Sequence, residues 1–249
     1  MLAEELGFEC IEWVIDSERL NENPIMTSTG QQEIRVLCKR HGVTVPAATS
    51  DHFMRSPYWK ASGDIRSNRE TVFMGVLRAC VAAGIPSVMV PLVDEGRLAA
   101  PVEEEALIES LLGRTNEIAQ LGLKITFESD YPPAELTRFI RRLEPDQFGL
   151  TYDIGDHASL GFDPREEIAS YGDRILNVHV KDRLRGGGTV PLGEGDADFD
   201  KVFSALSKCG YDGNFILQTA RDPAGNHVAS LERYRDLTLN WMIRHGLSS

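Results

Sequence analysis

Four polar side chains stand near the ends of short apolar segments and are of types that bind metal ions. They are Glu128 in KITFE, Asp153 in GLTYD, His179 in ILNVHVK and Gln218 in NFILQT. Three oxygen donors and one imidazole suit a divalent cation such as Mn²⁺, Mg²⁺ or Co²⁺ better than a thiol-seeking metal. The residue types therefore predict a metal site, provided that the four segments converge.

Strand alternation tells which side chains share a face. In NVHVKD, Asn177, His179 and Lys181 lie on one side and the two intervening valines on the other. The same alternation turns Glu128 and Asp153 to the inner face of their strands. A lone acid at a strand end more often caps a helix or pairs with a base, but one such group on each of four strands favours the metal interpretation.

The segments that must position these groups alternate between two patterns. Short apolar stretches predict strands over 10–14, 44–47, 87–91, 124–128, 149–153, 175–181 and 214–219. Apolar residues at helical spacing predict helices over 31–40, 69–82, 101–120, 134–143, 200–207 and 231–244. Such alternation is typical of a parallel sheet built of βα units.

Polar residues at several strand ends, with no glycine-rich phosphate fingerprint after the first strand, favour a (β/α)₈ barrel over an open sheet. The patterns predict seven strands rather than eight, because the chain opens with the helical segment LAEELG. We therefore expect a barrel that lacks its first strand. Either the native chain starts upstream, or a partner chain covers the open edges, which makes a homodimer the expected assembly.

Length and composition narrow the class of protein. The 249 residues carry a formal net charge of −12 and are expected to form one domain over 1–249. An acidic surface disfavours nucleic acid and anionic membranes as partners. Four scattered cysteines without a CxxC pair indicate reduced thiols, and no secretory signal or membrane span is recognised. A soluble, cytoplasmic protein is expected.

The chain also resembles a known family, the xylose isomerase-like TIM barrels, which include sugar isomerases, epimerases, inosose dehydratases and AP endonucleases. The resemblance runs from Leu2 onward and rests on LAEELGFECIEW, FESD, YDIGDHASLG, NVHVKDR, VPLGEGDADFDKVFSAL and GYDGNFILQ. These motifs are specific for the superfamily and much less so for a substrate.

The resemblance assigns roles residue by residue. It implies that Glu128 is a metal-binding acid/base, that Asp153 and His179 are metal ligands, and that Lys181 belongs to the HxKD motif and assists catalysis. Gln218 stands where the family usually has a second glutamate, which binds metal and transfers the second proton. An amide oxygen can still bind a cation, but it cannot exchange a proton at neutral pH.

Further residues are expected to bind substrate. Asp156 takes a position where relatives often carry His or Asn, and Glu12 can face inward as an acceptor for a sugar hydroxyl. Arg183 and Arg185 precede three glycines and can dock a sugar phosphate or sugar acid, or can belong to a solvated surface loop.

The expected function is a metal-dependent sugar or sugar-phosphate isomerase that works through an enediolate with Glu128 as its base. Epimerisation of a ketose at C3 requires two bases, so the amide of Gln218 favours isomerisation. A 3-epimerase with a replacement base, a dehydratase of keto sugars or cyclitols, and a silent sugar-binding relative stay as alternatives.

Overall fold

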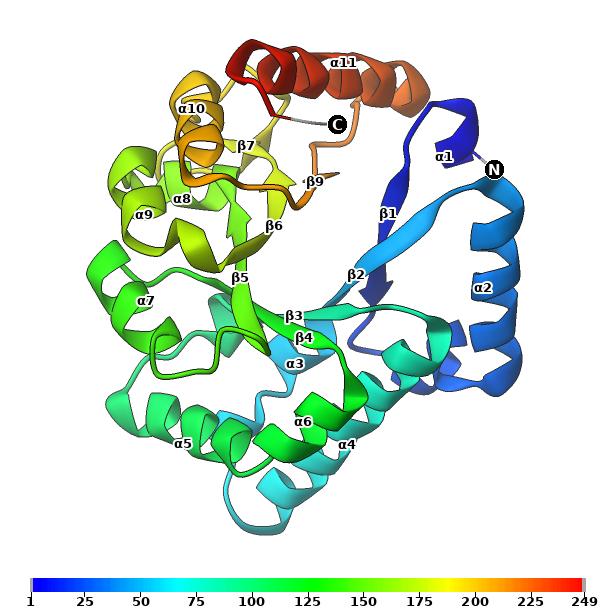
Figure 1. Ribbon diagram of the computed structural model, residues 1–249, viewed down its shortest axis with the longest axis vertical. Helices are drawn as coiled ribbons and strands as arrows, with labels where there is room; N and C mark the ends of the chain where they lie inside the picture. The colour runs from blue at the N-terminus through cyan, green and yellow to red at the C-terminus, as the bar shows by residue number, and fades with distance from the viewer. Residues whose placement is uncertain (1, 248–249) are drawn as a thin grey trace.

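The computed structural model describes residues 2–247 and shows parallel strands surrounded by a ring of helices (Figure 1). The seven strands of the main sheet are β1 (Cys10–Ile15), β2 (Thr44–Ser50), β3 (Ser87–Leu92), β4 (Lys124–Ser129), β5 (Phe148–Asp153), β6 (Ile175–Val180) and β9 (Asn214–Leu217). All seven predicted strands are therefore confirmed, with ends that differ by a few residues.

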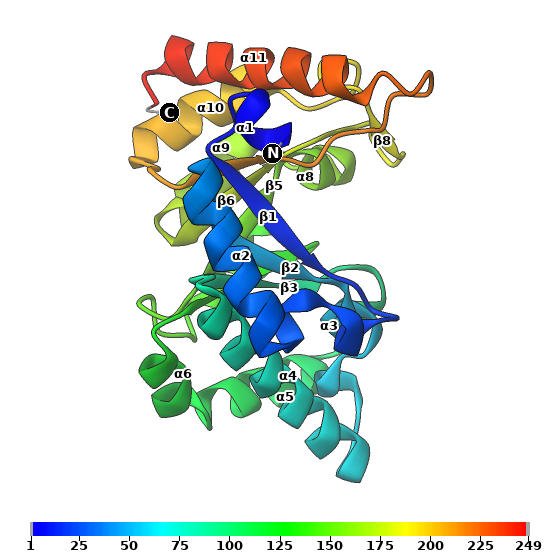
Figure 2. The same ribbon diagram turned by 90° about the vertical axis from the view of Figure 1, so that its right-hand side faces the viewer.

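The helices cover the outer side of this sheet, as the second view also shows (Figure 2). They are α1 (Leu2–Glu5), α2 (Ser28–His41), α3 (Asp51–Arg55), α4 (Gly63–Ala83), α5 (Pro101–Leu112), α6 (Thr115–Leu121), α7 (Pro133–Ile140), α8 (Ile154–Leu160), α9 (Pro164–Tyr171), α10 (Phe199–Cys209) and α11 (His227–His245). The helix predicted over 101–120 is split into α5 and α6 at Gly113 and Arg114, and α8 and α9 were not predicted.

The strand order is β1-β2-β3-β4-β5-β6-β9, with every neighbouring pair parallel. Among the described residues, β1 and β9 are the two end strands and do not pair with each other. The sheet is thus a nearly closed barrel with one strand missing, as predicted. In the outer layer, Arg235 of α11 donates to the carbonyl of Leu6 and joins the two sides of the opening.

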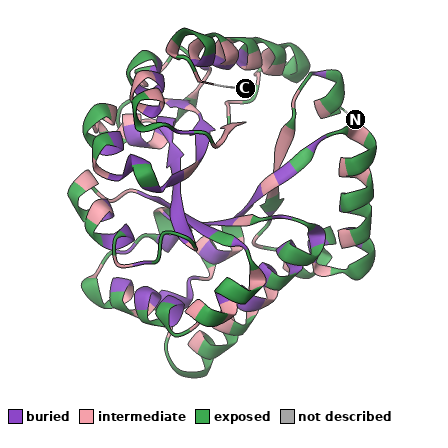
Figure 3. Ribbon diagram, viewed as in Figure 1, coloured by how far each residue is buried: buried purple, intermediate pink, exposed green. Residues whose placement is uncertain are grey.

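The apolar core lies between the outer face of the sheet and the helices, where Figure 3 shows buried strands beneath helices with exposed outer sides. Phe127 of β4 packs edge-on against Phe139 of α7 at 5.3 Å between ring centroids. The inner face is more polar: Thr126 and Thr151 are buried there and share a hydrogen bond of 2.8 Å. Alternation along the strands therefore separates an apolar outer core from a polar interior.

The segment after β6 is a short antiparallel hairpin formed by β7 (Asp182–Arg183) and β8 (Thr189–Val190). Asp182 is fully buried and accepts hydrogen bonds from the backbone N–H groups of Gly193, Gly195 and Ala197. The VPLGEGDA segment is therefore held beside the hairpin by one carboxylate. No helix in residues 2–247 is long and apolar enough to cross a membrane.

Candidate metal centre

Three of the four predicted ligands meet at the carboxyl ends of neighbouring strands. Glu128 comes from β4, Asp153 from β5 and His179 from β6, and one ligand atom of each lies within 4.8 Å of the other two. The register pairs Asp153 directly with His179. All three side chains are buried, with His179 and Asp153 at 0% exposure and Glu128 at 6%. Convergence, which the sequence alone left open, is thus confirmed for these three.

The imidazole of His179 has a free nitrogen facing the carboxylates. Its Nδ1 atom lies 3.7 Å from Glu128 Oε2 and 3.7 Å from Asp153 Oδ2. Within residues 2–247 neither ring nitrogen of His179 has an aligned hydrogen-bond partner, and Nδ1 is the one that faces two carboxylates. Buried polar atoms are normally paired, so an unpaired nitrogen between two carboxylates fits a cation that takes all three as ligands.

Burial or the neighbouring carboxylates raise the pKa values of two groups in this cluster. Burial, and next the nearby Asp153 carboxylate, raises the pKa of Glu128 well above its ordinary value. Burial alone would lower the pKa of His179, but Asp153, Glu12 and Glu128 together outweigh it and raise that pKa well above its ordinary value. The cluster therefore attracts positive charge, in the form of protons or of a cation.

Asp153 also serves the local fold. Its Oδ1 atom accepts a hydrogen bond of 2.8 Å from the backbone N–H of Asp156 and caps the first turn of α8. Its Oδ2 atom faces His179 and lies 3.3 Å from Lys181 Nζ. Asp153 can therefore serve both roles considered for a strand-end acid. Its Oδ1 atom caps a helix, and its Oδ2 atom is available to a metal ion.

Lys181 and Arg183 gather around Asp156. Asp156 Oδ1 lies 3.0 Å from Lys181 Nζ and 2.6 Å from Arg183 Nη1, and Arg183 also donates to the Gly187 carbonyl at 2.7 Å. Burial would raise the pKa of Asp156, but Lys181, Glu128 and Arg183 lower it to about 2. Burial would lower the pKa of Lys181, but Asp153, Asp156 and Glu128 raise it. Lys181 is therefore an ammonium ion at the edge of the metal centre.

Gln218 and Arg185 lie in different surroundings. Gln218 follows β9, its side chain is exposed, and its backbone N–H donates to Val180 at 3.2 Å. The register sets Ile216 beside His179, so alternation turns Gln218 toward the same side of the sheet. Arg185 packs its guanidinium over Gly161 and lines a 340 Å³ cavity between α8 and α10, outside the barrel. Their predicted roles as metal ligand and substrate ligand stay predictions.

Glu12, predicted to accept a sugar hydroxyl, contacts the histidine of the candidate metal centre directly. Its Oε2 atom is 2.9 Å from His179 Nε2, and its Oε1 atom accepts a hydrogen bond of 3.0 Å from Asn177. The neighbouring Trp13 packs against the outer core, as alternation along β1 predicts. The sequence analysis placed Asn177 on the inner face but gave it no role. Its position two residues before His179 was the available signal.

A second cluster beside the centre was missed. Glu167 is fully buried and accepts hydrogen bonds from the hydroxyls of Tyr152 and Tyr171, each at 2.9 Å, and pairs with His157. Tyr152 precedes Asp153, and His157 lies in α8. This network fixes α8, and with it Asp156, against α9. No sequence pattern pointed to it, because its members are joined only through the packing of two short helices.

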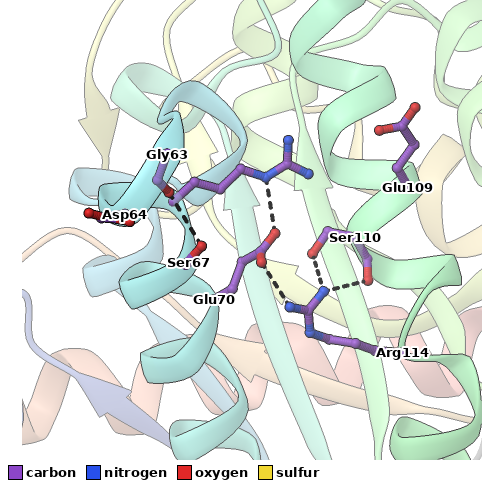
Figure 4. Close-up of a pocket in the computed structure, with 8 residues that line it drawn as sticks. Gly63, Asp64, Ser67, Glu70, Glu109, Ser110 and Arg114 are labelled. Carbon is purple, nitrogen blue, oxygen red and sulfur yellow. Dashed lines mark hydrogen bonds and ion pairs between the residues drawn. The ribbon is translucent and has the colours of Figure 1, made fainter.

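A larger surface pocket, of 520 Å³, lies between α4 and α5 (Figure 4). Three of its charged groups pair with each other: Glu70 accepts from Arg66 at 3.0 Å and from Arg114 at 2.8 Å, and Arg114 also donates to Ser110. The pocket is lined by the helix layer and contains none of the predicted site residues.

Comparisons with known proteins agree with the predicted family and fold. The family model described as xylose isomerase-like TIM barrel matches residues 1–239. The chain is 26% identical over 260 residues to L-ribulose-5-phosphate 3-epimerase UlaE of Salmonella heidelberg (strain SL476), a match that covers 99% of this chain and 89% of that protein. It is 28% identical over 171 residues to inosose dehydratase of Geobacillus kaustophilus (strain HTA426), covering 59% of this chain but only 55% of that protein.

A solved structure, that of the IOLI protein with a bound zinc atom, superposes with a TM-score of 0.78 at 17% identity. The match covers 98% of this chain and 91% of that chain, so the two share the whole barrel. The match to the family model covers nearly the entire sequence. The chain therefore belongs to the xylose isomerase-like TIM barrel family.

Proposed function

We propose that this protein is a divalent-metal-dependent isomerase of a sugar or sugar phosphate, with Glu128 as its base. The observation that carries the proposal is the buried triad of Glu128, Asp153 and His179, in which the unpaired Nδ1 faces two carboxylates. Relatives named as a sugar-phosphate 3-epimerase and an inosose dehydratase support a carbohydrate substrate. The neighbour with bound zinc supports a metal.

Glu128, Asp153 and His179 would hold the cation, and Gln218 is the proposed fourth ligand. When bound, the cation would polarise the substrate carbonyl and favour negative charge on its oxygen. Glu128 would then take the proton from the hydroxyl-bearing carbon next to the carbonyl and return it to the former carbonyl carbon. The proton of that hydroxyl would pass to the former carbonyl oxygen, so that the carbonyl moves by one carbon. Burial, and next Asp153, raises the pKa of Glu128, and nearby positive charge would lower that pKa and free the carboxylate to act as a base.

Lys181 would supply a fixed positive charge beside the reacting oxygens. Its ammonium group is held between Asp153 and Asp156, and its pKa is raised by these carboxylates. Arg183 is fixed by Asp156 and Gly187 and is proposed to bind a substrate oxygen or phosphate at the rim. Asp156 is proposed to accept a substrate hydroxyl while orienting both cations.

One base favours isomerisation over epimerisation. A two-base epimerase removes a proton from one face of a carbon and returns it from the other. Here Gln218 replaces the expected second carboxylate, and an amide neither takes nor gives a proton at neutral pH. A 3-epimerase stays as the second candidate, because one relative is named as such an enzyme and the match to it covers 89% of that protein.

The test begins with a measurement of the metal content of the purified protein. NMR then monitors the uptake of solvent deuterium into a panel of ketoses and ketose phosphates. We expect one metal ion per chain and exchange that falls by roughly 10²–10⁴ in Glu128→Gln, the usual contribution of a positioned base. Asp130→Asn, which changes an acid just after β4 that pairs with Arg97, is the matched control.

The position of the label separates the candidates. Deuterium at C1 of the ketose or at C2 of the aldose product supports the isomerase. Deuterium at C3 of a ketose, with the carbonyl still at C2, supports the epimerase. If the protein binds no metal and labels no sugar, the proposal is wrong. That result favours a sugar-binding relative without catalytic activity.

A further inference from the structure

The side chain of Glu12 reaches from the end strand β1 to the metal histidine on β6. Its carboxylate is 7% exposed, and its Oε2 atom lies 2.9 Å from His179 Nε2. Its other oxygen accepts a hydrogen bond of 3.0 Å from Asn177, which lies on the same strand as His179. Both oxygens of Glu12 thus contact side chains of β6.

The two nitrogens of His179 face different partners. Nδ1 faces Glu128 and Asp153 at 3.7 Å, whereas Nε2 faces Glu12. A neutral imidazole carries one proton, and only the nitrogen without it can bind a cation. The nitrogen near the two other ligands is Nδ1, so the proton belongs on Nε2, where Glu12 is the acceptor within reach.

We propose that Glu12 is a positioning residue that accepts the Nε2–H of His179 and so directs the Nδ1 lone pair toward the cation. This inference rests on the metal site of the proposed function. A carboxylate in this position fixes the tautomer and ring orientation of a metal-binding histidine and increases its basicity. The Nε2 contact of 2.9 Å is short but not in line, so the proposed hydrogen bond requires the ring to turn.

Asn177 determines which substitution at Glu12 is conservative. Its amide nitrogen donates to Glu12, while its Oδ1 atom is buried without a hydrogen-bond partner in the described part of the chain. If the amide of Asn177 turns over, Oδ1 can accept from a glutamine at position 12, whose own oxygen can still accept from His179. Glu12→Gln therefore keeps the hydrogen bonds and loses only the charge, whereas Glu12→Ala loses both.

The first measurement is calorimetric titration of the metal-free protein with Mn²⁺. Loss of a carboxylate that supports a metal-binding histidine typically weakens metal binding 10- to 100-fold. We expect a Kd increase in that range for Glu12→Ala and a smaller increase for Glu12→Gln. Asp16→Asn, just after the end of β1, removes one negative charge from the same region without a contact to His179, and we expect it to leave the Kd within twofold of the wild type.

A second measurement reports the role directly. With ¹⁵N-labelled histidine and Zn²⁺ as a diamagnetic probe, NMR should show Nδ1 bound to metal and a slowly exchanging proton on Nε2. In Glu12→Ala we expect this proton to exchange much faster with water, and in Glu12→Gln to stay slow. A purely structural role for Glu12 would not change the exchange of this one proton.

The outcomes distinguish the two proposals. A wild-type protein that binds no cation overturns the proposed function and this inference with it. A wild type that binds Mn²⁺ while folded Glu12→Ala binds it within twofold overturns the inference alone, as does metal on Nε2. If Glu12→Ala does not fold, Glu12→Gln decides the matter: a rapidly exchanging Nε2 proton there would contradict the proposed hydrogen bond.

Discussion

At the scale of single residues, the centre is a set of carboxylates arranged around one imidazole. Glu128, Asp153 and Glu12 approach His179 from three different strands, with Lys181 as the nearest compensating charge. Burial strengthens every one of these interactions, because the low dielectric of the interior screens charges less than water does. An acidic cluster of this kind attracts positive charge, in the form of protons or of a cation.

A substitution at Gln218, the proposed fourth ligand, tests whether an additional negative charge there strengthens metal binding. Gln218→Glu adds a carboxylate on the inner side of the sheet, and we expect it to tighten Mn²⁺ binding by roughly tenfold, which corresponds to about 1.4 kcal/mol. The measurement is calorimetric titration beside wild type. Thr219→Glu, one residue further along the chain, is the control for charge alone, and equal tightening in both variants would contradict a ligand role for position 218.

At the scale of elements, two short helices hold the rim of the centre in place. α8 begins at the Asp153 cap, and its His157 pairs with the buried Glu167 of α9. Tyr152 and Tyr171 donate to the same carboxylate. Because the cluster anchors α8, it fixes the backbone that carries Asp156 between Lys181 and Arg183.

The pairing of α8 with α9 predicts a pH-dependent stability. Burial alone would lower the pKa of His157, but Glu167 outweighs it and raises that pKa above the ordinary value near 6.5. A pKa raised on folding means that the folded state holds the proton more tightly than the unfolded chain. The resulting stabilisation is complete below about pH 6.5 and is lost as the pH rises through the folded-state pKa.

We therefore expect the Tm of wild type to fall more between pH 6 and pH 9 than the Tm of His157→Gln, as measured by differential scanning calorimetry. In a domain of this size each kcal/mol corresponds to about 2–4 °C in Tm. His227→Gln, at an exposed histidine at the start of α11, should follow wild type. Parallel curves for wild type and His157→Gln would show that the His157–Glu167 pair does not titrate with folding.

At the scale of the whole molecule, the barrel is a sheet that stops one strand short of closure. β1 and β9 flank the opening, and α11 reaches across it through Arg235 and Leu6 (Figure 1). Glu12 also links the two sides, because β1 carries it and β6 carries its partners. The candidate metal centre therefore contains a contact between β1 and β6, on opposite sides of the opening.

Native-state hydrogen exchange tests this arrangement. We expect amides of β4 and β5 to exchange slowest, because both strands are paired on two sides, and those amides of β1 and β9 that face the opening to exchange at least 100-fold faster. Slow exchange along the outer edge of β1 would contradict an open edge. Light scattering on the same sample would then show whether a second copy of the chain covers it, as the predicted dimer requires.

The sequence by itself determined the strands, their inner faces and the three residues that converge in the candidate metal centre. Alternation is a local property, so KITFE, GLTYD and NVHVKD identify Glu128, Asp153 and His179 as inward-facing without knowledge of the rest of the chain. The parallel arrangement follows as well, since the strands alternate with helices.

Only the tertiary structure decided which groups from distant segments meet. Asn177 and Glu12 are 165 residues apart, and their contact depends on how far the incomplete barrel curls toward closure. The same curvature leaves Gln218 exposed, while the turn of the β7–β8 hairpin carries Arg185 outside the barrel. Side-chain alternation depends on neighbouring residues alone, whereas these contacts depend on the packing of every strand between them.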